Sequence, residues 1–352
     1  MKKYIAAVLA AFLLLSSFPV RPALGAEISS ERLSALQAQA EQQGLTVVYT
    51  GVVTKSVALR ESPSKDSARL GALSEGERVA ISDYDTQWLH VVSETHGTGY
   101  ILRQYCVDIT PVDPSTTLPC GAVVHHYTAV VAQDTAIYKD PNESGDAYCN
   151  LTAGSLFSFW YMEDGWALTP YWRELGYVPM DKLTSLTPVS PTVDYAQSGD
   201  MLSVFTSFYS TKDTELNRGR MVNIDVACDY ISQVMQPGES WSFNNVAGPY
   251  KKARGYQAAP VLIDGTTVPG YGGGTCQVSS TLYNTLLLLP HNMTILQRRP
   301  HGPGGAKYLP HGVDAAVGNE SLDLVFRNDF DFPIRIRATA KDGALCIAII
   351  KE

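Results

Sequence analysis

The stretch "GYGGGTCQVSSTLYNTLLLLP" occupies residues 270–290 and joins three consecutive glycines to a cysteine and then to an apolar run. The glycines permit backbone angles and close approaches that a side chain would prevent. Leucines and a tyrosine recur at helical spacing after Cys276, which predicts a helix over residues 276–289 with a buried face. Cys276 therefore falls in the first helical turn, where unpaired backbone N–H groups and the helix dipole favour an anion.

Two interpretations of Cys276 follow. In the first it is a nucleophile, because a helix N-terminus favours the reactive thiolate, and the N–H groups there can stabilise an oxyanion. In the second it is a buried structural thiol behind a glycine turn. A cysteine nucleophile usually needs a base, and a glycine- and proline-rich loop downstream supplies His301 and His311, with Asp314 as an orienting group. We favour the nucleophile, which makes Cys276, His301, Asp314 and His311 the catalytic candidates.

The first 26 residues have the three parts of a secretory signal peptide. Lys2 and Lys3 precede an apolar run over residues 5–15, and "ALGA" supplies small residues before a cleavage site expected after Ala26. The apolar run is shorter than the ~20 residues of a membrane span. We therefore expect an exported protein, extracellular and associated with the cell wall, with an uncleaved N-terminal membrane anchor as the alternative.

The bulk composition limits the partners. The sequence has 27 Lys and Arg against 35 Asp and Glu, a formal net charge of −8, and the expected signal peptide contains three of the basic residues and no acid. This acidic balance argues against nucleic acid or an anionic membrane as the main partner. No second hydrophobic stretch is long enough to predict an integral membrane domain.

Six cysteines in an exported chain raise the question of disulfides. Cys106 and Cys120 flank a proline-rich connection and could pair. Cys228 and Cys346 lie in apolar patterns that are typical of buried thiols. Cys149 has no obvious partner.

Two segments of the chain repeat each other. Pro63 matches Pro141 and Trp88 matches Trp166, each pair 78 positions apart, and "GTGY" before residue 101 matches "ELGY" before residue 178. Short alternating strands with Pro, Gly and Asp turns predict a small β-barrel for each repeat. We expect a short N-terminal helix and linker over residues 27–46, barrels over residues 47–110 and 127–186, and proline-rich spacers over residues 111–126 and 187–200.

The pattern changes from about residue 201. Apolar side chains at three- and four-residue spacing predict an amphipathic helix within residues 217–238, stopped by Pro237 and Gly238. Terminal strands are predicted for "LDLVFRN", "PIRIRATA" and "ALCIAII". Residues 201–352 are therefore expected to form an α+β domain with an antiparallel sheet, after two small all-β barrels.

Both parts of the chain resemble known families. "LRESPS", "LGALSEGERV", "WLHVV" and "GYI" in the first repeat resemble the bacterial SH3-like domain, and the second repeat does so more weakly. Such modules commonly bind cell-wall peptide or act as spacers. Residues ~200–350 resemble the VanW domain family through "PGESWSFNNVAGPYKKARGYQAAPVLIDG", "GGGTCQVSSTLYN", "RRPHG" and "YLPHGVDAAV".

The VanW resemblance implies a cell-wall enzyme. The family takes its name from glycopeptide-resistance clusters, and some members act as cysteine-dependent L,D-transpeptidases that cross-link peptidoglycan stem peptides. The resemblance places the nucleophile on Cys276 and the family histidine on His301, with His311 ranked second. The expected partner is the peptidoglycan stem peptide, and no cofactor or metal is implied. The residues expected to contact this peptide are Gly273, Gly274, Gln277, Ser279, Arg298 and Arg299.

Two other functions fit the sequence. One is a cell-wall-binding protein without catalysis, in which all domains recognise peptidoglycan. The other is a metal-dependent hydrolase that uses Cys276, His301, His311 and Asp314. These residue types suit zinc, but no compact spacing such as HxxxH or CxxC supports it.

Overall fold

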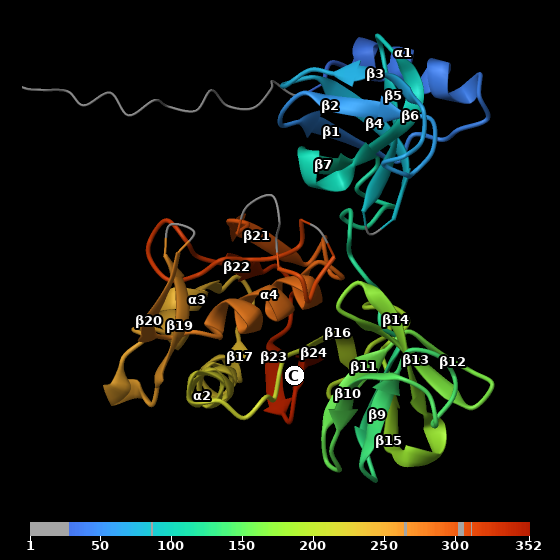
Figure 1. Ribbon diagram of the computed structural model, residues 1–352. Coiled ribbons are helices and arrows are strands. Elements are labelled where there is room, and N and C mark those ends of the chain that lie inside the picture. Colours follow the sequence, from blue (N-terminus) through green and yellow to red (C-terminus); the bar gives the residue numbers. More distant parts are fainter. Residues whose placement is uncertain (1–27, 86, 264–265, 302–305, 311) are drawn as a thin grey trace, which may run out of the picture.

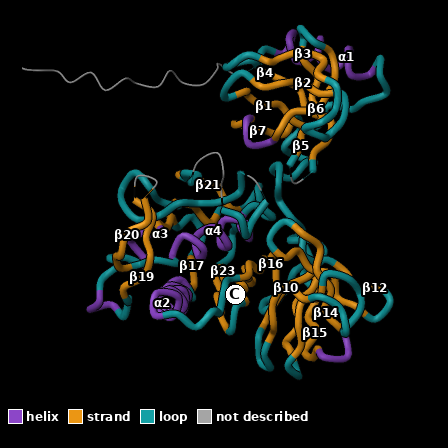
Figure 2. The backbone as a smooth tube through the Cα atoms, viewed as in Figure 1, coloured by secondary structure: helices purple, strands orange, loops and turns teal. Residues whose placement is uncertain are grey.

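The protein is described here by a computed structural model, which covers residues 28–352 except residues 86, 264–265, 302–305 and 311. The expected signal peptide lies outside the described residues. The chain is mostly β-structure, with several antiparallel sheets and few helices (Figure 2). Among the described residues, no helix combines the length and the apolar character that a membrane span requires.

The first β unit contains one helix and one seven-stranded antiparallel sheet, in the order β3-β2-β6-β5-β4-β1-β7. The helix α1 (Ser30–Glu41) confirms the predicted N-terminal helix, and its Leu36 and Ala40 are fully buried against this unit. The strands are β1 (Tyr49–Val53), β2 (Val57–Arg60), β3 (Arg69–Leu73), β4 (Arg78–Tyr84), β5 (Trp88–Ser93), β6 (Gly97–Leu102) and β7 (Cys106–Pro111), with the 3-10 helix η1 (Arg103–Tyr105) before β7.

The second β unit repeats this strand order. Its two sheets run β10-β9-β14-β13-β12 and β11-β8-β15, which is the order of the first unit with its fourth strand divided into β11 and β12. The elements are β8 (Tyr127–Val131), β9 (Thr135–Tyr138), β10 (Ala147–Leu151), β11 (Leu156–Phe159), β12 (Tyr161–Glu163), β13 (Trp166–Tyr171), β14 (Glu174–Pro179), η2 (Met180–Lys182) and β15 (Leu183–Pro188).

The sequence landmarks of the repeat occupy equivalent positions in the two units. Trp88 begins β5, and Trp166 begins the equivalent β13. Gly99 and Gly176 lie in the partner strands, where an added Cβ would meet Leu59 in one unit and Ile137 in the other. The shared glycine is explained by a close approach between the same two neighbouring strands in both units.

The C-terminal domain, from β16 onward, surrounds a four-stranded antiparallel sheet in the order β16-β24-β23-β17. Two smaller sheets have the orders β18-β22-β21 and β19-β20. The strands are β16 (Met201–Phe208), β17 (Val234–Met235), β18 (Ser240–Ser242), β19 (Ala258–Ile263), β20 (Thr266–Tyr271), β21 (Met293–Gln297), β22 (Val325–Asn328), β23 (Ile334–Lys341) and β24 (Ala344–Lys351). The helices are α2 (Glu215–Ile231), α3 (Phe243–Ala247), η3 (Lys252–Arg254) and α4 (Thr275–Leu286).

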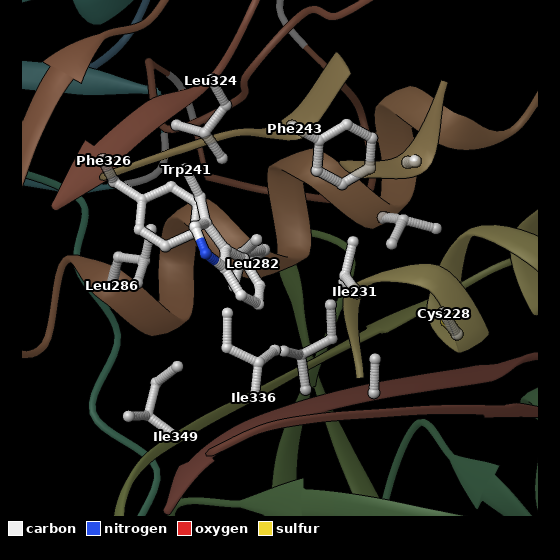
Figure 3. Close-up of a cluster of buried hydrophobic side chains, with 14 of the residues drawn as sticks. Cys228, Ile231, Trp241, Phe243, Leu282, Leu286, Leu324, Phe326, Ile336 and Ile349 are labelled. Carbon is white, nitrogen blue, oxygen red and sulfur yellow. The ribbon is translucent and has the colours of Figure 1, made fainter. Parts of the chain in front are cut away.

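Both faces of the main sheet are covered, which explains why β16 and β24 are almost continuously buried. On one face Ile347 and Ile349 of β24 join the cluster formed by α2 and α4, and Figure 3 shows Ile349 and Ile336 beneath Leu282 and Leu286 of α4. On the other face Ala348 packs with Leu156 of β11. The second β unit therefore lies against the C-terminal sheet (Figure 1).

The interface between the second β unit and the C-terminal sheet also contains polar contacts. The backbone N–H of Ser158 donates to Thr206 Oγ1 at 2.8 Å, and Ser158 Oγ lies 2.5 Å from Nδ1 of the fully buried His125. His125 lies 5.0 Å from the ring of Phe205, centroid to centroid. Because buried polar groups need partners, these contacts fix how the two units dock.

Two expectations need correction, and one possibility that the sequence left open is resolved. The predicted spacers are packed in part, since Cys120, His125 and Ala196 are all buried. Their proline content suggested extended segments, although the residues around the prolines make apolar contacts. The first helix of the C-terminal domain ends at Ile231, before the predicted stop at Pro237, because residues 234–235 pair with β23 as a strand. The described cysteines are free thiols, including Cys106 and Cys120, which share one buried cluster.

Candidate functional site

The glycine turn places Cys276 at the start of α4, as its second residue. Gly274 caps the helix with a φ of +109°, a backbone conformation that L side chains rarely adopt. At Gly273 an added Cβ would lie 2.3 Å from the carbonyl oxygen of Pro260. The two glycines thus act through their backbone conformation and their lack of a side chain. Together these allow α4 to begin in close contact with β19. The α2 residue Asn223 fixes the turn, because its Nδ2 donates to the Gly273 carbonyl at 2.9 Å.

The thiol of Cys276 is half-buried and meets the backbone of Val317. Sγ lies 3.4 Å from the Val317 carbonyl oxygen and 3.5 Å from the Val317 nitrogen. Cys276 also lies close enough to His301 to raise the pKa of that imidazole. Cys276 is therefore neither sealed in the core nor bridged to another cysteine.

His301 and Asp314 form a coupled pair behind the thiol. Nδ1 of His301 lies 2.5 Å from Asp314 Oδ2, and the backbone N–H of His301 donates to the same oxygen at 2.7 Å. Because Nδ1 is held by the carboxylate, Nε2 is the ring nitrogen left for the thiol. The structure thus brings together three of the four catalytic candidates, while His311 lies outside the described residues.

The electrostatics favour a protonated His301. Burial by itself would lower its pKa, but the hydrogen bonds and charges of Asp314 and Cys276 outweigh burial and raise the pKa to about 10. For Asp314, burial would raise the pKa, but the two hydrogen bonds from His301 and the charges of His301 and Arg298 lower it. A positive imidazolium held between a carboxylate and a sulfur is a suitable counter-ion for a thiolate.

The segment that carries Asp314 is fastened to α4 by polar side chains. Ser280 Oγ accepts from the Ala315 N–H at 2.9 Å, and Ser279 Oγ donates to the Ala315 carbonyl at 2.6 Å. One turn further along, Asn284 Nδ2 donates to the Val313 carbonyl at 2.7 Å. The sequence analysis missed this positioning role; its signal was the number of polar side chains that the helix carries among its buried residues.

Two residues expected to contact the peptide are instead structural. Gln277 is 1% exposed, accepts from Arg220, and donates to Ser207 Oγ and to the Phe208 carbonyl at 3.0 and 3.1 Å. Ser279 is fully buried. Adjacency to Cys276 in sequence suggested contact with substrate, but the helical twist turns both side chains into the protein.

The two arginines have different environments. Arg298 donates through Nε to the Asp314 carbonyl at 2.7 Å, and its guanidinium lies 4.9 Å from the centre of the Tyr283 ring. Nη2 lies 3.7 Å from Asp314 Oδ1, so Arg298 holds the Asp314 segment. Arg299 is exposed at the surface beside this loop.

The second β unit also reaches the loop that follows His301. Arg173, in the turn between β13 and β14, donates through Nε to the Leu309 carbonyl at 2.9 Å and through Nη2 to the Ala306 carbonyl at 3.2 Å. Tyr308, between these two residues, donates to the Cys276 carbonyl at 3.4 Å. The unit therefore contributes to the architecture of the site.

A pocket of about 620 Å³ borders the segment that contacts the thiol. One wall is Tyr250, which packs in the same cluster as Cys276, and another is Gly318, which follows the residue that contacts Sγ. The volume is within the range of ligand-binding clefts. Within the described part of the chain, no group of three or more His, Cys, Asp or Glu side chains is placed to hold a metal ion.

Comparisons with known proteins agree with both resemblances. The family described as VanW like protein matches residues 219–350, and the bacterial SH3 domain family matches residues 55–106. The uncharacterized protein YoaR of Bacillus subtilis (strain 168) is 28% identical over 230 residues, which cover 63% of this chain and 73% of YoaR. The vancomycin B-type resistance protein VanW of Enterococcus faecalis (strain ATCC 700802 / V583) is 29% identical over 138 residues, which cover 37% of this chain and 48% of VanW.

Solved structures give a weaker likeness. NlpC2 from Trichomonas vaginalis is 15% identical, over 53% of this chain and 58% of that chain, with a TM-score of 0.16. An NlpC/P60 family protein from Bacillus cereus ATCC 10987 is 10% identical, over 86% and 94% of the two chains, also with a TM-score of 0.16. Scores this low carry no argument about this protein. The two family matches do: the chain carries a VanW-like domain at residues 219–350, preceded by a bacterial SH3 domain at residues 55–106.

Proposed function

We propose that the protein is an exported, cell-wall-associated cysteine acyltransferase of the L,D-transpeptidase type, which acts on peptidoglycan stem peptides. The observation that carries the proposal is the grouping of three residues: His301 Nδ1 lies 2.5 Å from Asp314 Oδ2, and Cys276 raises the pKa of the same imidazole. The thiol itself is half-buried at the start of α4. The VanW-like and bacterial SH3 domains support a role at the cell wall, as does the name of the VanW relative.

The first step forms an acyl-enzyme. The Cys276 thiolate attacks the carbonyl of the L-centre of the diamino acid in a tetrapeptide stem, and the dipole of α4 favours negative charge at this point. The protonated His301 then donates its proton to the departing amine. The C–N bond breaks, terminal D-alanine leaves, a thioester remains on Sγ, and His301 is left neutral.

The second step transfers the acyl group. An amine of another stem attacks the thioester carbonyl, the C–S bond breaks, and an amide cross-link forms while His301 takes up a proton from the attacking amine. Water in place of the amine gives trimming instead of cross-linking. Asp314 keeps Nδ1 engaged throughout, so that Nε2 faces the reacting atoms.

The test is incubation of the purified protein with tetrapeptide muropeptides, followed by mass spectrometry of the protein and the products. We expect free D-alanine, a tripeptide adduct on Cys276 and cross-linked dimers. Cys276→Ala should abolish all three. The matched control is Cys149→Ala, since Cys149 is also a partly buried free thiol but belongs to the second β unit.

Two outcomes would contradict the proposal. Dimers formed by Cys276→Ala would remove the thiol from the mechanism. A wild-type protein that binds muropeptides without any adduct or product would favour the non-catalytic wall-binding function.

A further inference from the structure

The pocket beside Cys276 has an unbalanced charge. Its lining includes the carboxylates of Glu320 and Asp323, and among the described residues it contains no Lys, Arg or His. Among the described residues, neither carboxylate has an ion-pair partner within 4 Å. The pocket therefore presents negative charge beside the segment that contacts the nucleophile.

The two carboxylates differ in their surroundings. Asp323 is 7% exposed and accepts hydrogen bonds only from neutral donors, namely Ser242 Oγ and the backbone N–H groups of Asn244 and Leu324. Glu320 is exposed at the edge of the pocket. A buried carboxylate without a cation keeps its field unscreened, so the pocket attracts a cation.

The path of the chain links this pocket to the proposed chemistry. Asp314 contacts His301, Val317 contacts Sγ, and Gly318, Asn319 and Glu320 then line the pocket. A ligand in the pocket thus lies along the segment whose Val317 contacts Sγ. The aromatic rings of Tyr250 and Tyr271 form walls that suit the methylene groups of an aliphatic chain.

We propose that this pocket is the acceptor subsite and binds the protonated side-chain amine of the second stem peptide. This inference rests on the proposed function, since it names the co-substrate of the same site. The negative lining selects against the carboxylate end of a donor stem and favours an ammonium group.

The proton balance of acyl transfer fits this arrangement. The bound ammonium first loses one proton to solvent, which frees the electron pair on nitrogen for attack on the thioester carbonyl. The nitrogen gives its second proton to the neutral His301 as the amide bond forms and the C–S bond breaks, which restores the imidazolium. The D-alanine amine expelled earlier takes up one proton from solvent, so the overall exchange is neutral.

The test separates binding from catalysis. Binding of an acceptor tripeptide with a free side-chain amine is measured by calorimetry on Cys276→Ala, which cannot form the acyl-enzyme. The same peptide with its side-chain amine acetylated serves as the uncharged probe. We expect the acetylated peptide to bind at least about fivefold more weakly than the free amine. We expect the same loss when the free amine binds to the protein that carries Glu320→Gln in addition to Cys276→Ala. Glu320→Lys should weaken binding of the free amine about tenfold or more, because the new lysine also repels the ammonium group.

A control and a second measurement sharpen the result. Asp331→Asn removes an exposed carboxylate that does not line the pocket and should leave binding unchanged. In the active protein, Glu320→Gln should shift products from cross-linked dimer toward hydrolysed tripeptide.

Equal binding of the free and acetylated peptides, or unchanged binding in Glu320→Lys, would overturn the subsite. Binding without any acyl-enzyme in the wild type would instead refute the proposed function while leaving the amine pocket in place.

Discussion

Arg173 of the second β unit donates a hydrogen bond from Nε to the Leu309 carbonyl oxygen of the C-terminal domain, over 2.9 Å. The same guanidinium also donates to the Ala306 carbonyl. The two residues are 136 positions apart in sequence, so a module expected to bind cell-wall peptide or to act as a spacer holds part of the loop that lies between His301 and Asp314.

Arg173→Met should therefore reduce activity without unfolding the protein. Loss of charged hydrogen bonds to two backbone carbonyls costs about 1.5–3 kcal/mol each, which loosens residues 306–309. We expect roughly tenfold lower kcat and faster amide hydrogen exchange in residues 306–309. Lys139→Met, which removes a surface cation of the same unit, is the control. Unchanged exchange in this loop would contradict the role of Arg173.

The pair of His301 and Asp314 predicts a specific pH dependence of stability. The raised pKa of His301, about 10 against an ordinary 6.5, means that its proton stabilises the fold fully below pH 6.5. This stabilisation falls as pH rises from 6.5 and is lost above about 10. The lowered pKa of Asp314 adds stability above its ordinary 3.8, which is lost on acidification.

The loss in the free energy of unfolding caused by Asp314→Asn should therefore be largest between pH 3.8 and 6.5. It should become progressively smaller toward pH 10. The measurement is urea unfolding across this range. Asp331→Asn, an exposed carboxylate in a turn, should show a small and nearly constant difference. A wild-type advantage that grows with pH would be inconsistent with a protonated His301.

Gly274→Ala should both destabilise the protein and impair the site. The residue has a φ of +109°, and its Cβ would lie 2.9 Å from the Arg220 carbonyl oxygen. We expect a loss of about 1–3 kcal/mol in the free energy of unfolding. Gly238→Ala is the matched control, because Gly238 also has a positive φ but nothing lies within 4 Å of its Cβ position. Equal losses would mean that the close contact with Arg220 does not matter.

Residues 201–352 alone should fail to form a soluble monomer. The face of β16 and β24 that packs on the second β unit includes Val204, Ala348 and Ile350, all buried in the whole protein. Exposure of such a patch favours aggregation. Residues 112–352, which keep the second unit, should elute as a monomer and unfold cooperatively. A monomeric, cooperatively unfolding 201–352 fragment would show that the interface is dispensable.

The local features of this protein were predictable from sequence. The repeat fixed the equivalent strands of the two β units, because turn residues and strand periodicity act over a few positions. The glycine turn, the helix behind it and the place of Cys276 in its first turn follow from the same short-range rules. The residues alone offered both His301 and His311 as bases in one loop, and the resemblance to the VanW family ranked His301 first.

Long-range packing decided the rest. The sequence does not reveal that Ser280 and Asn284 hold the Asp314 segment, that Gln277 and Ser279 face inward, or that Arg173 crosses from another unit. These contacts join residues tens of positions apart, and their free energy depends on burial that exists only after the layers have docked. The sequence alone therefore determined which groups are available for chemistry, whereas the tertiary structure decided which of them meet, because desolvation and hydrogen-bond geometry are properties of the packed chain.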